Sequence, residues 1–212
     1  MQLALTVDVE ARPHPCVDGN FRAMVDALLD AGAPATLFVQ GGWVEERATD
    51  DELAALQADG MVVGLHGHTH RAFTELSADE IGVELASSEA ALTDRGITPV
   101  RPLFRFPYLA GNTDVFVLET VRALGWRHVD CHAIAYDWET ALRDEPVRVA
   151  ANAIRDVEAR RTAGEECAIV LLHSWPDPTP ATVRILLDYA RTRDDELVAV
   201  TDLPRDAWDA PT

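Results

Sequence analysis

Three of the seven histidines in this sequence lie within five residues, at His66, His68 and His70. Neutral imidazole is a common ligand of zinc and similar ions, and histidines clustered this closely are typical of a metal site. Imidazoles four residues apart face the same side if the segment makes a helical turn, so we predict that His66 and His70 share an ion. The plainer alternative is a polar loop with incidental histidines. His68 either lines the pocket or is a surface residue, and we favour the surface residue.

Two acidic residues end an apolar segment near the start of the chain, in Thr6-Val7-Asp8-Val9-Glu10. Positions two apart in a strand point to the same face, so both carboxylates can reach one pocket. A hydrolytic metal site usually has a third protein ligand and open positions for water, and Asp8 and Glu10 are the available carboxylates. A strand end at which the acids simply meet water is the alternative.

Other polar groups also follow apolar segments. Arg105 stands in Arg105-Phe106-Pro107-Tyr108, and a buried arginine needs a carboxylate partner, for which Asp8 is our candidate. His173 ends Leu171-Leu172-His173. Taken alone, it is more often a hydrogen-bonded core residue than a catalyst.

The elements that must position these groups alternate along the chain. Short apolar runs predict strands at 3–7, 35–39, 61–65, 103–106, 126–131, 168–172 and 197–200. Helical periodicity and capping signals predict helices at 20–32, 51–58, 77–92, 114–124, 147–160 and 179–191, with Asn20, Ser77 and Thr179 as caps and a Ser77–Glu80 capping box. Strict alternation favours a parallel sheet, open or closed into a barrel. Each candidate residue then lies just after a strand, where functional groups of parallel α/β folds gather.

The length of the chain bears on the number of domains, and its net charge bears on the classes of partner that it can bind. The 212 residues suit one domain covering 1–212. The formal net charge is −18 and every basic residue is arginine, a surface that repels nucleic acid and anionic membranes. We therefore predict neither a nucleic acid nor a membrane partner. The charge fits a neutral or cationic small substrate, and we leave open a homo-oligomer.

The cysteines and the apolar runs bear on the compartment. Cys16, Cys131 and Cys167 are odd in number and widely spaced, which favours a reducing compartment over a disulfide framework. The sequence shows neither a signal-peptide pattern nor an apolar run of the ~20 residues that a membrane span needs. We expect a cytoplasmic protein.

Together these clusters resemble the polysaccharide deacetylase family, also called the NodB-homology domain or carbohydrate esterase family 4. The likeness spans nearly the whole chain, and its motifs occur in the family's order at Thr6–Glu10, His66–His70, Arg105–Tyr108, Asp137-Trp138 and Leu171–His173. The family's fold is a distorted (β/α) barrel, usually with seven strands. The resemblance therefore implies an α/β fold, a distorted (β/α)7 barrel with parallel strands.

The resemblance also implies a division of labour in amide hydrolysis. His66 and His70 bind one divalent metal ion, expected to be zinc, with cobalt, nickel and iron as alternatives. Asp8 is the general base, and His173 is the general acid that protonates the departing amine.

The remaining motif residues support these groups. Arg105 holds the base, and Tyr108 supplies a backbone N–H to the oxyanion hole. Asp137 and Trp138 orient His173 and form a wall of the pocket.

Two departures from the family pattern refine the expectation. Val9 stands where the family has its second aspartate, and Asp8-Val9-Glu10 with His66-Gly67-His68-Thr69-His70 matches a subgroup with D-x-E and H-G-x-x-H. We therefore assign Glu10 as the third metal ligand, with Asp8 as the alternative. Ile134 replaces the first aspartate of D-x-x-D-W, which leaves the tuning of His173 open.

The subgroup resembles peptidoglycan deacetylase-like, allantoinase-like and cyclic-imide-hydrolysing proteins. The resemblance implies a metal-dependent hydrolase that removes an N-acetyl or N-formyl group from an amino sugar or a related amide, with a small-molecule or oligosaccharide substrate. The alternatives are a non-sugar amide or cyclic-imide hydrolase and a non-catalytic metal-binding domain.

Overall fold

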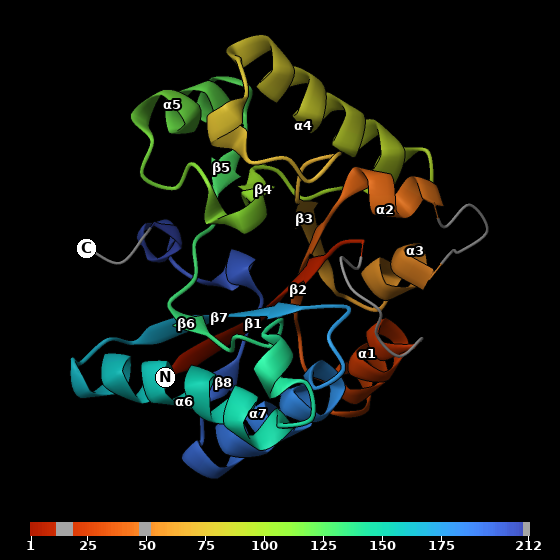
Figure 1. The fold of residues 1–212 in the computed structure, drawn as a ribbon. Helices are drawn as coiled ribbons and strands as arrows, with labels where there is room; N and C mark the ends of the chain where they lie inside the picture. Colours follow the sequence, from red (N-terminus) through yellow and green to blue (C-terminus); the bar gives the residue numbers. More distant parts are fainter. Residues whose placement is uncertain (12–18, 47–51, 210–212) are drawn as a thin grey trace. The chain divides into compact units, whose positions relative to one another are not determined.

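A computed structural model describes residues 1–11, 19–46 and 52–209. The chain divides into two compact units. Unit 1 comprises Met1–Asp8, Arg12–Thr36 and Cys131–Ala207, and unit 2 comprises Val9–Ala11, Leu37–Asp130 and Trp208–Thr212. Figure 1 labels the helices and strands of both. Cys16 and the predicted helix start at Asp51 lie outside the described residues, and a single domain over 1–212 stays a prediction.

Unit 1 is built on parallel strands. β1 (Gln2–Val9) pairs with β7 (Cys167–His173) in a register that sets Asp8 opposite His173. β6 (Ala133–Ile134) pairs with β7, and β8 (Glu196–Leu197) pairs with the start of β1. β1 is buried from its second residue onward, as expected of a parallel strand that is covered on both faces.

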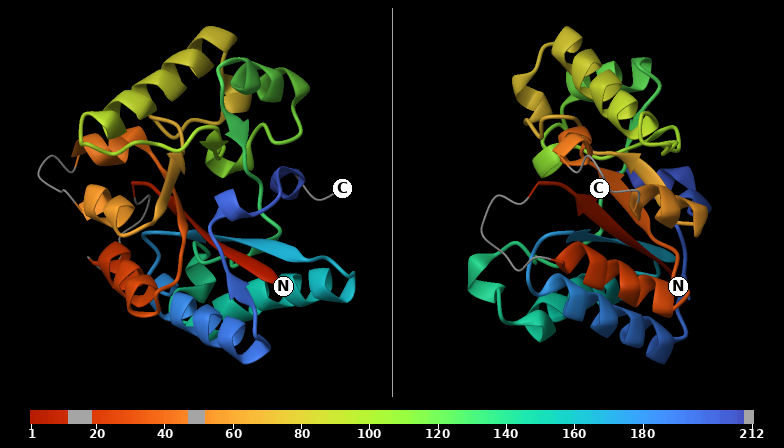
Figure 2. Two further views of the ribbon diagram at one scale, coloured as in Figure 1. Left: turned by 180° about the vertical axis from the view of Figure 1, so that it is seen from behind. Right: turned by 90° about the vertical axis from the view of Figure 1, so that its right-hand side faces the viewer.

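Three helices cover these strands. α7 (Thr179–Arg193) packs against both α1 (Asn20–Asp30) and α6 (Pro146–Thr162), and all three lie on the same side of β1 and β7 in Figures 1 and 2. The predicted caps at Asn20 and Thr179 are wrong. Each is instead the first residue of its helix, after Gly19 and Pro178 respectively, and its side chain donates to groups distant in sequence.

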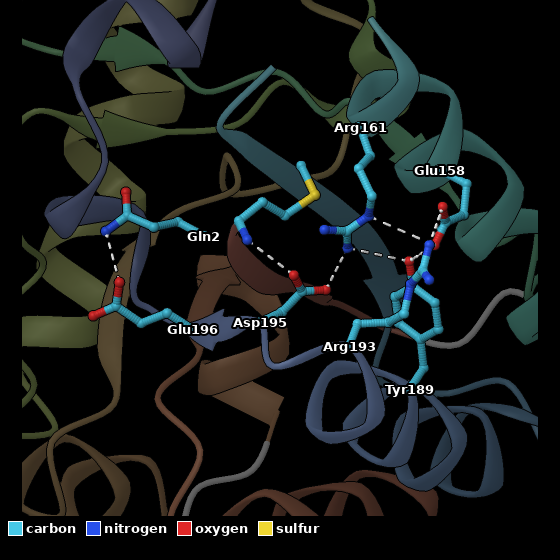
Figure 3. A network of polar contacts seen from close by, with 8 residues as sticks. Gln2, Glu158, Arg161, Tyr189, Arg193, Asp195 and Glu196 are labelled. Carbon is cyan, nitrogen blue, oxygen red and sulfur yellow. Dashed lines mark hydrogen bonds and ion pairs between the residues drawn. The ribbon is translucent and has the colours of Figure 1, made fainter. Parts of the chain in front are cut away.

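Figure 3 shows a polar network that ties α6 to α7 and to the segment before β8. Arg161 of α6 donates to Asp195 at 2.7 Å. The Tyr189 hydroxyl and the Arg193 guanidinium of α7 both donate to Glu158 of α6, at 2.5 Å. These contacts connect the surfaces of the two helices outside their apolar contact.

The strands of unit 2 carry the histidine cluster. They are β2 (Thr36–Val39, whose first residue belongs to unit 1), β3 (Val62–Leu65), β4 (Leu103–Phe104) and β5 (Arg127–His128). β4 pairs in parallel with β3 and with β5, and the His66 N–H donates to Val39 at the ends of β3 and β2. Packed phenylalanine rings, with centroids 4.9–5.4 Å apart, form part of the core of this unit: Phe73, Phe104 and Phe106.

The helices of unit 2 are α2 (Gly41–Glu46), α3 (Glu52–Ala58), α4 (Ala78–Thr93) and α5 (Val115–Ala123). The predicted capping box at α4 is confirmed, since Ser77 and Glu80 bond reciprocally. α4 packs against α2 and α5. Short 3-10 helices occupy Phe73–Glu75, Pro107–Leu109, Thr140–Leu142, Val200–Asp202 and Arg205–Trp208.

Three predicted strands end earlier than expected, and the first of them, predicted at 103–106, ends at Phe104. The strand predicted at 126–131 ends at His128. Two residues later, the backbone N–H of Asp130 donates to the carbonyl of Trp208 and not to a neighbouring strand. The strand predicted at 197–200 ends at Leu197, and the Val200 N–H donates to the hydroxyl of Thr36. The two-residue strand β6 was not predicted.

The strand pairs described above within each unit are parallel, and helices alternate with strands along the chain. This confirms the predicted α/β class. Across the described part of the chain, no helix has both the length and the apolar character needed to cross a membrane. Cys131 and Cys167 are buried thiols.

Candidate functional site

Three predicted metal ligands converge in unit 2. Glu10, His66 and His70 offer ligand atoms that lie within 4.8 Å of one another. The Nε2 atoms of the two histidines are 3.3 Å apart, and Glu10 Oε2 lies 3.2 Å from Nε2 of His66 and in contact with Nε2 of His70. His66 and Glu10 are buried, and the His70 side chain is 18% exposed. One face of the cluster is therefore reachable from outside.

The histidines converge through a turn of irregular backbone instead of the helical turn on which the prediction rested. Residues 66–70 form no helix, and both Gly67 and His70 have positive φ, at 71° and 61°. The reversals bring the two rings to a centroid distance of 5.1 Å. Residues with a side chain rarely adopt the positive φ of Gly67, so a substitution there would strain the backbone. This explains why a glycine lies between the two histidines.

The donor set fits a divalent cation. Nδ1 of His66 lies 3.0 Å from the carbonyl oxygen of Arg105, which can only accept, so Nδ1 carries the proton and Nε2 directs its lone pair at Glu10. A buried carboxylate facing such a lone pair is costly unless a proton or a cation lies between them. Two imidazoles and one carboxylate are a ligand set of catalytic zinc sites, which retain positions for water.

The predicted general acid lies in unit 1 at the end of β7. Nδ1 of His173 lies 2.9 Å from Oδ1 of Asp137, and its backbone N–H donates to Oδ2 of the same carboxylate at 2.8 Å. The Thr179 hydroxyl also donates to Oδ2, at 2.7 Å. Because an ionised carboxylate can only accept, Asp137 fixes the proton of His173 on Nδ1 and leaves Nε2 for chemistry. This orientation is present with Ile134 in place of the family's acid.

Aromatic rings flank His173. The Trp138 ring lies edge-on to the imidazole at a centroid distance of 4.9 Å, and the Trp175 ring lies at 6.3 Å. Tyr136, which has a φ of 58°, contacts Trp138. These apolar faces limit the positions that His173 can adopt.

Asp8 is buried in unit 1, at 3% exposure. Its alpha carbon pairs with that of His173 across β1 and β7, and its carbonyl accepts from the Ser174 N–H at 3.0 Å. The predicted base and the predicted acid therefore end neighbouring strands of one unit.

Arg105 and Tyr108 lie in unit 2 on the segment after β4. Arg105 is fully buried, donates to the carbonyls of Val129 and Asp130 at 3.0 and 3.3 Å, and covers the Phe38 ring. Its predicted pairing with Asp8 stays a prediction. Tyr108 has a φ of 57° and is 72% exposed, and its ring lies edge-on to His70 at 4.6 Å. The exposed Tyr108 ring thus borders the metal cluster.

His68 is not the surface residue that we predicted. Its side chain is only one-fifth exposed, and Nε2 lies 3.6 Å from Glu45 of α2. An added Cβ at Gly41 would come within 2.6 Å of Nδ1 of His68, so the imidazole is packed against the start of α2. Loop packing therefore accounts for the third histidine of the cluster.

Several supporting residues were missed by sequence reasoning. Glu84 of α4 bonds the loop between His66 and His70, and Thr179 bonds Asp137. His128 accepts from the Phe106 N–H, just before Tyr108, at 3.3 Å. Each is separated from its partner by at least 15 residues, so no pattern of neighbouring residues indicates these pairings.

Comparison with known proteins gives consistent matches. The family model described as polysaccharide deacetylase matches residues 2–129. A chitin deacetylase from Colletotrichum lindemuthianum is 27% identical over 198 residues, covering 90% of this chain and 77% of that protein. Among solved structures, a family 4 carbohydrate esterase from Streptomyces lividans in complex with acetate superposes with a TM-score of 0.72 at 24% identity, covering 91% of this chain and 89% of that one.

A pseudoenzyme of the same esterase family from Bacillus anthracis is also similar, with a TM-score of 0.77 at 20% identity over 95% of this chain and 64% of that one. These likenesses confirm the predicted fold, the (β/α)7 type of the family. Because the family model covers more than half of the sequence, this chain belongs to the polysaccharide deacetylase family.

Proposed function

We propose that this chain is a metal-dependent hydrolase that removes an N-acetyl or N-formyl group from an amino sugar. The observation that carries the proposal is the Glu10–His66–His70 cluster, because its donors converge as a hydrolytic metal site requires. Family membership adds the reaction class, and the relatives named as chitin deacetylase and carbohydrate esterase add the sugar.

Glu10, His66 and His70 are the residues that would hold the ion, which we propose to be zinc, with cobalt, nickel or iron able to use the same donors. When bound, such an ion polarises the amide carbonyl and makes a water molecule more acidic. Glu10 is the carboxylate of the cluster, which supports it over Asp8 as ligand. Asp8 is then available for proton transfer.

In the proposed reaction, Asp8 takes a proton from the attacking water. The Tyr108 N–H donates to the oxygen of the former carbonyl as it becomes negative. His173 gives the proton on Nε2 to the departing amine, a poor leaving group unless it is protonated, while Asp137 keeps Nδ1 protonated. The chain links the two clusters directly, since one residue separates Asp8 from Glu10.

Arg105 and the aromatic residues have supporting roles in this proposal. Arg105 is fully buried, and we propose that it holds the base, Asp8, in position. Trp138 would restrict His173 and form a wall for the substrate. We further propose that the chain acts as a single functional domain in a cytoplasmic protein.

The test is acyl release by the purified chain. Metal-free protein is loaded separately with zinc, cobalt, nickel or iron and incubated with N-acetylated and N-formylated glucosamine and chitooligosaccharides, and acetate and formate are measured. The proposal predicts release that needs metal and is lost in His66→Ala and His173→Ala. Loaded, folded protein that leaves every sugar intact would refute it.

A non-sugar amide or cyclic imide is the second candidate substrate. The observation that favours it is the replacement of the family's second aspartate by Val9, with Glu10 supplying the carboxylate of the cluster instead. A parallel panel of allantoin, hydantoins and simple N-acyl amines separates the two candidates, because hydrolysis there with sugars inert selects the second.

A non-catalytic metal-binding role is the third candidate. The similar structure from Bacillus anthracis is described as a pseudoenzyme, so the fold alone does not ensure catalysis. Bound metal in the parent chain, together with equal residual activity in the parent and in His173→Ala, would select this role.

A further inference from the structure

One buried carboxylate holds the loop between the two metal histidines. Glu84 of α4 is 6% exposed. Its Oε2 accepts from the backbone N–H groups of His68 at 2.8 Å and Thr69 at 2.9 Å, and its Oε1 accepts from the Thr69 hydroxyl at 2.5 Å. All three donors lie between His66 and His70 in the sequence.

This loop needs such a partner because its backbone is turned away from regular structure. Gly67 and His70 have positive φ, and the N–H groups of His68 and Thr69 bond Glu84 instead of a helix or a strand. A buried N–H without an acceptor is costly, so these amides require a group below the loop. A Cβ at Gly67 would lie 3.3 Å from Oε2 of Glu84, which shows how closely the carboxylate underlies the turn.

The carboxylate comes from a rigid element. α4 begins with the Ser77–Glu80 capping box and packs against α2 and β3. The capping box and this packing therefore fix the position of Glu84 on its helix. The carboxylate also places negative charge beneath a site that would hold a cation, and charge in a buried environment is weakly screened.

We propose that Glu84 is a positioning residue that preorganises His66 and His70 for the metal ion and raises the affinity of the site. The inference rests on the proposed metal site but not on the substrate. If the loop were disordered before the ion binds, ordering it would cost conformational entropy and weaken binding. The hydrogen bonds to Glu84 order the loop when the chain folds, so this entropy is lost before the ion binds.

The experiment measures metal affinity directly. Zinc binding is followed by competition with a chromophoric chelator, and the ligand geometry by the visible absorption spectrum of the cobalt-loaded protein. The variants are Glu84→Gln, Glu84→Asp and Thr69→Val. Glu89→Gln is the matched control, because Glu89 lies on the same helix and carries the same charge but bonds Arg101.

We expect Glu84→Gln to bind zinc roughly 10–100-fold more weakly, the usual cost of losing a group that orients metal ligands. The cobalt spectrum should also change. Glu84→Asp keeps the charge but withdraws the carboxylate, so it should also weaken binding. Thr69→Val removes one donor only, so its effect should be smaller, and Glu89→Gln should bind like the parent.

Thermal unfolding of the metal-free variants separates positioning from general stability. Equal zinc affinity and an unchanged cobalt spectrum in Glu84→Gln would overturn the proposal even if the variant were less stable. If Glu84→Gln does not fold, unaltered affinity in both Glu84→Asp and Thr69→Val would overturn it. A parent chain that binds no metal refutes the proposed function as well, whereas equal binding by parent and variants refutes this inference alone.

Discussion

Replacing Asp137 by asparagine tests the orientation of the proposed acid with little change of shape. In the parent chain, Asp137 accepts from the backbone N–H of His173, from the ring Nδ1–H of His173 and from the hydroxyl of Thr179. In Asp137→Asn, one amide oxygen can still serve the two donors at the Oδ2 position. The NH₂ group then faces Nδ1, so a doubly protonated imidazole would meet a donor where it had an acceptor.

The magnitude follows from the lost contact. A hydrogen bond to a charged group contributes roughly 1.5–3 kcal/mol, and this contribution is lost for the protonated ring. Because about 1.4 kcal/mol corresponds to one unit of pH, the alkaline limb of the rate profile should move down by about 1–2 units. The sign follows from the role: an acid must be protonated, and the variant holds its proton less tightly.

Two assays check this prediction. The rate of acyl release is measured against pH, and the two ring nitrogens of His173 are followed by nitrogen-15 NMR. In the neutral ring, the proton should move from Nδ1 in the parent to Nε2 in Asp137→Asn. Thr179→Val is the control, because it removes a neighbouring bond to Asp137 and leaves the charge in place. An unmoved alkaline limb with the proton still on Nδ1 would refute the reasoning.

Three further outcomes are expected. Removal of metal by a chelator should abolish acyl release and zinc should restore it, whereas Glu10→Gln should retain less zinc by elemental analysis; full metal content in that variant would argue against Glu10 as ligand. Phe73→Ala should lower the free energy of unfolding by about 3–5 kcal/mol in urea, because it removes a fully buried ring; a loss below 1 kcal/mol, on the order expected of surface positions, would contradict the packing. Hydrogen bonds from Tyr189 and Arg193 lower the pKa of Glu158 from 4.5, so Glu158→Gln should lower the melting temperature at neutral pH. The difference should shrink as pH falls below 4.5 and vanish once pH is below the lowered pKa of the folded chain, where the parent carboxylate is also protonated. A difference constant with pH would exclude the ion pair as its cause.

The class of fold and the candidate metal ligands could be predicted from local sequence patterns. The spacing of His66 and His70 and the position of Asp8 and Glu10 after an apolar strand indicated a metal site, and the resemblance to a subgroup favoured Glu10 as the third ligand. The structure brings Glu10, His66 and His70 together. The Ser77–Glu80 box was equally readable, because its partners lie within one helical turn. Such local signals need no knowledge of the rest of the chain.

The contacts that position these groups could not be predicted from the sequence. The turn at Gly67, the carboxylate of Glu84 beneath it, and the bond of Thr179 to Asp137 join segments far apart in sequence. Thr179 illustrates the reason: its type and position predicted a helix cap, but it is the first residue of the helix and its hydroxyl donates to the buried carboxylate of Asp137, which is distant in the chain. The packing of the whole chain sets such long-range contacts, so a pattern of neighbouring residues does not predict them.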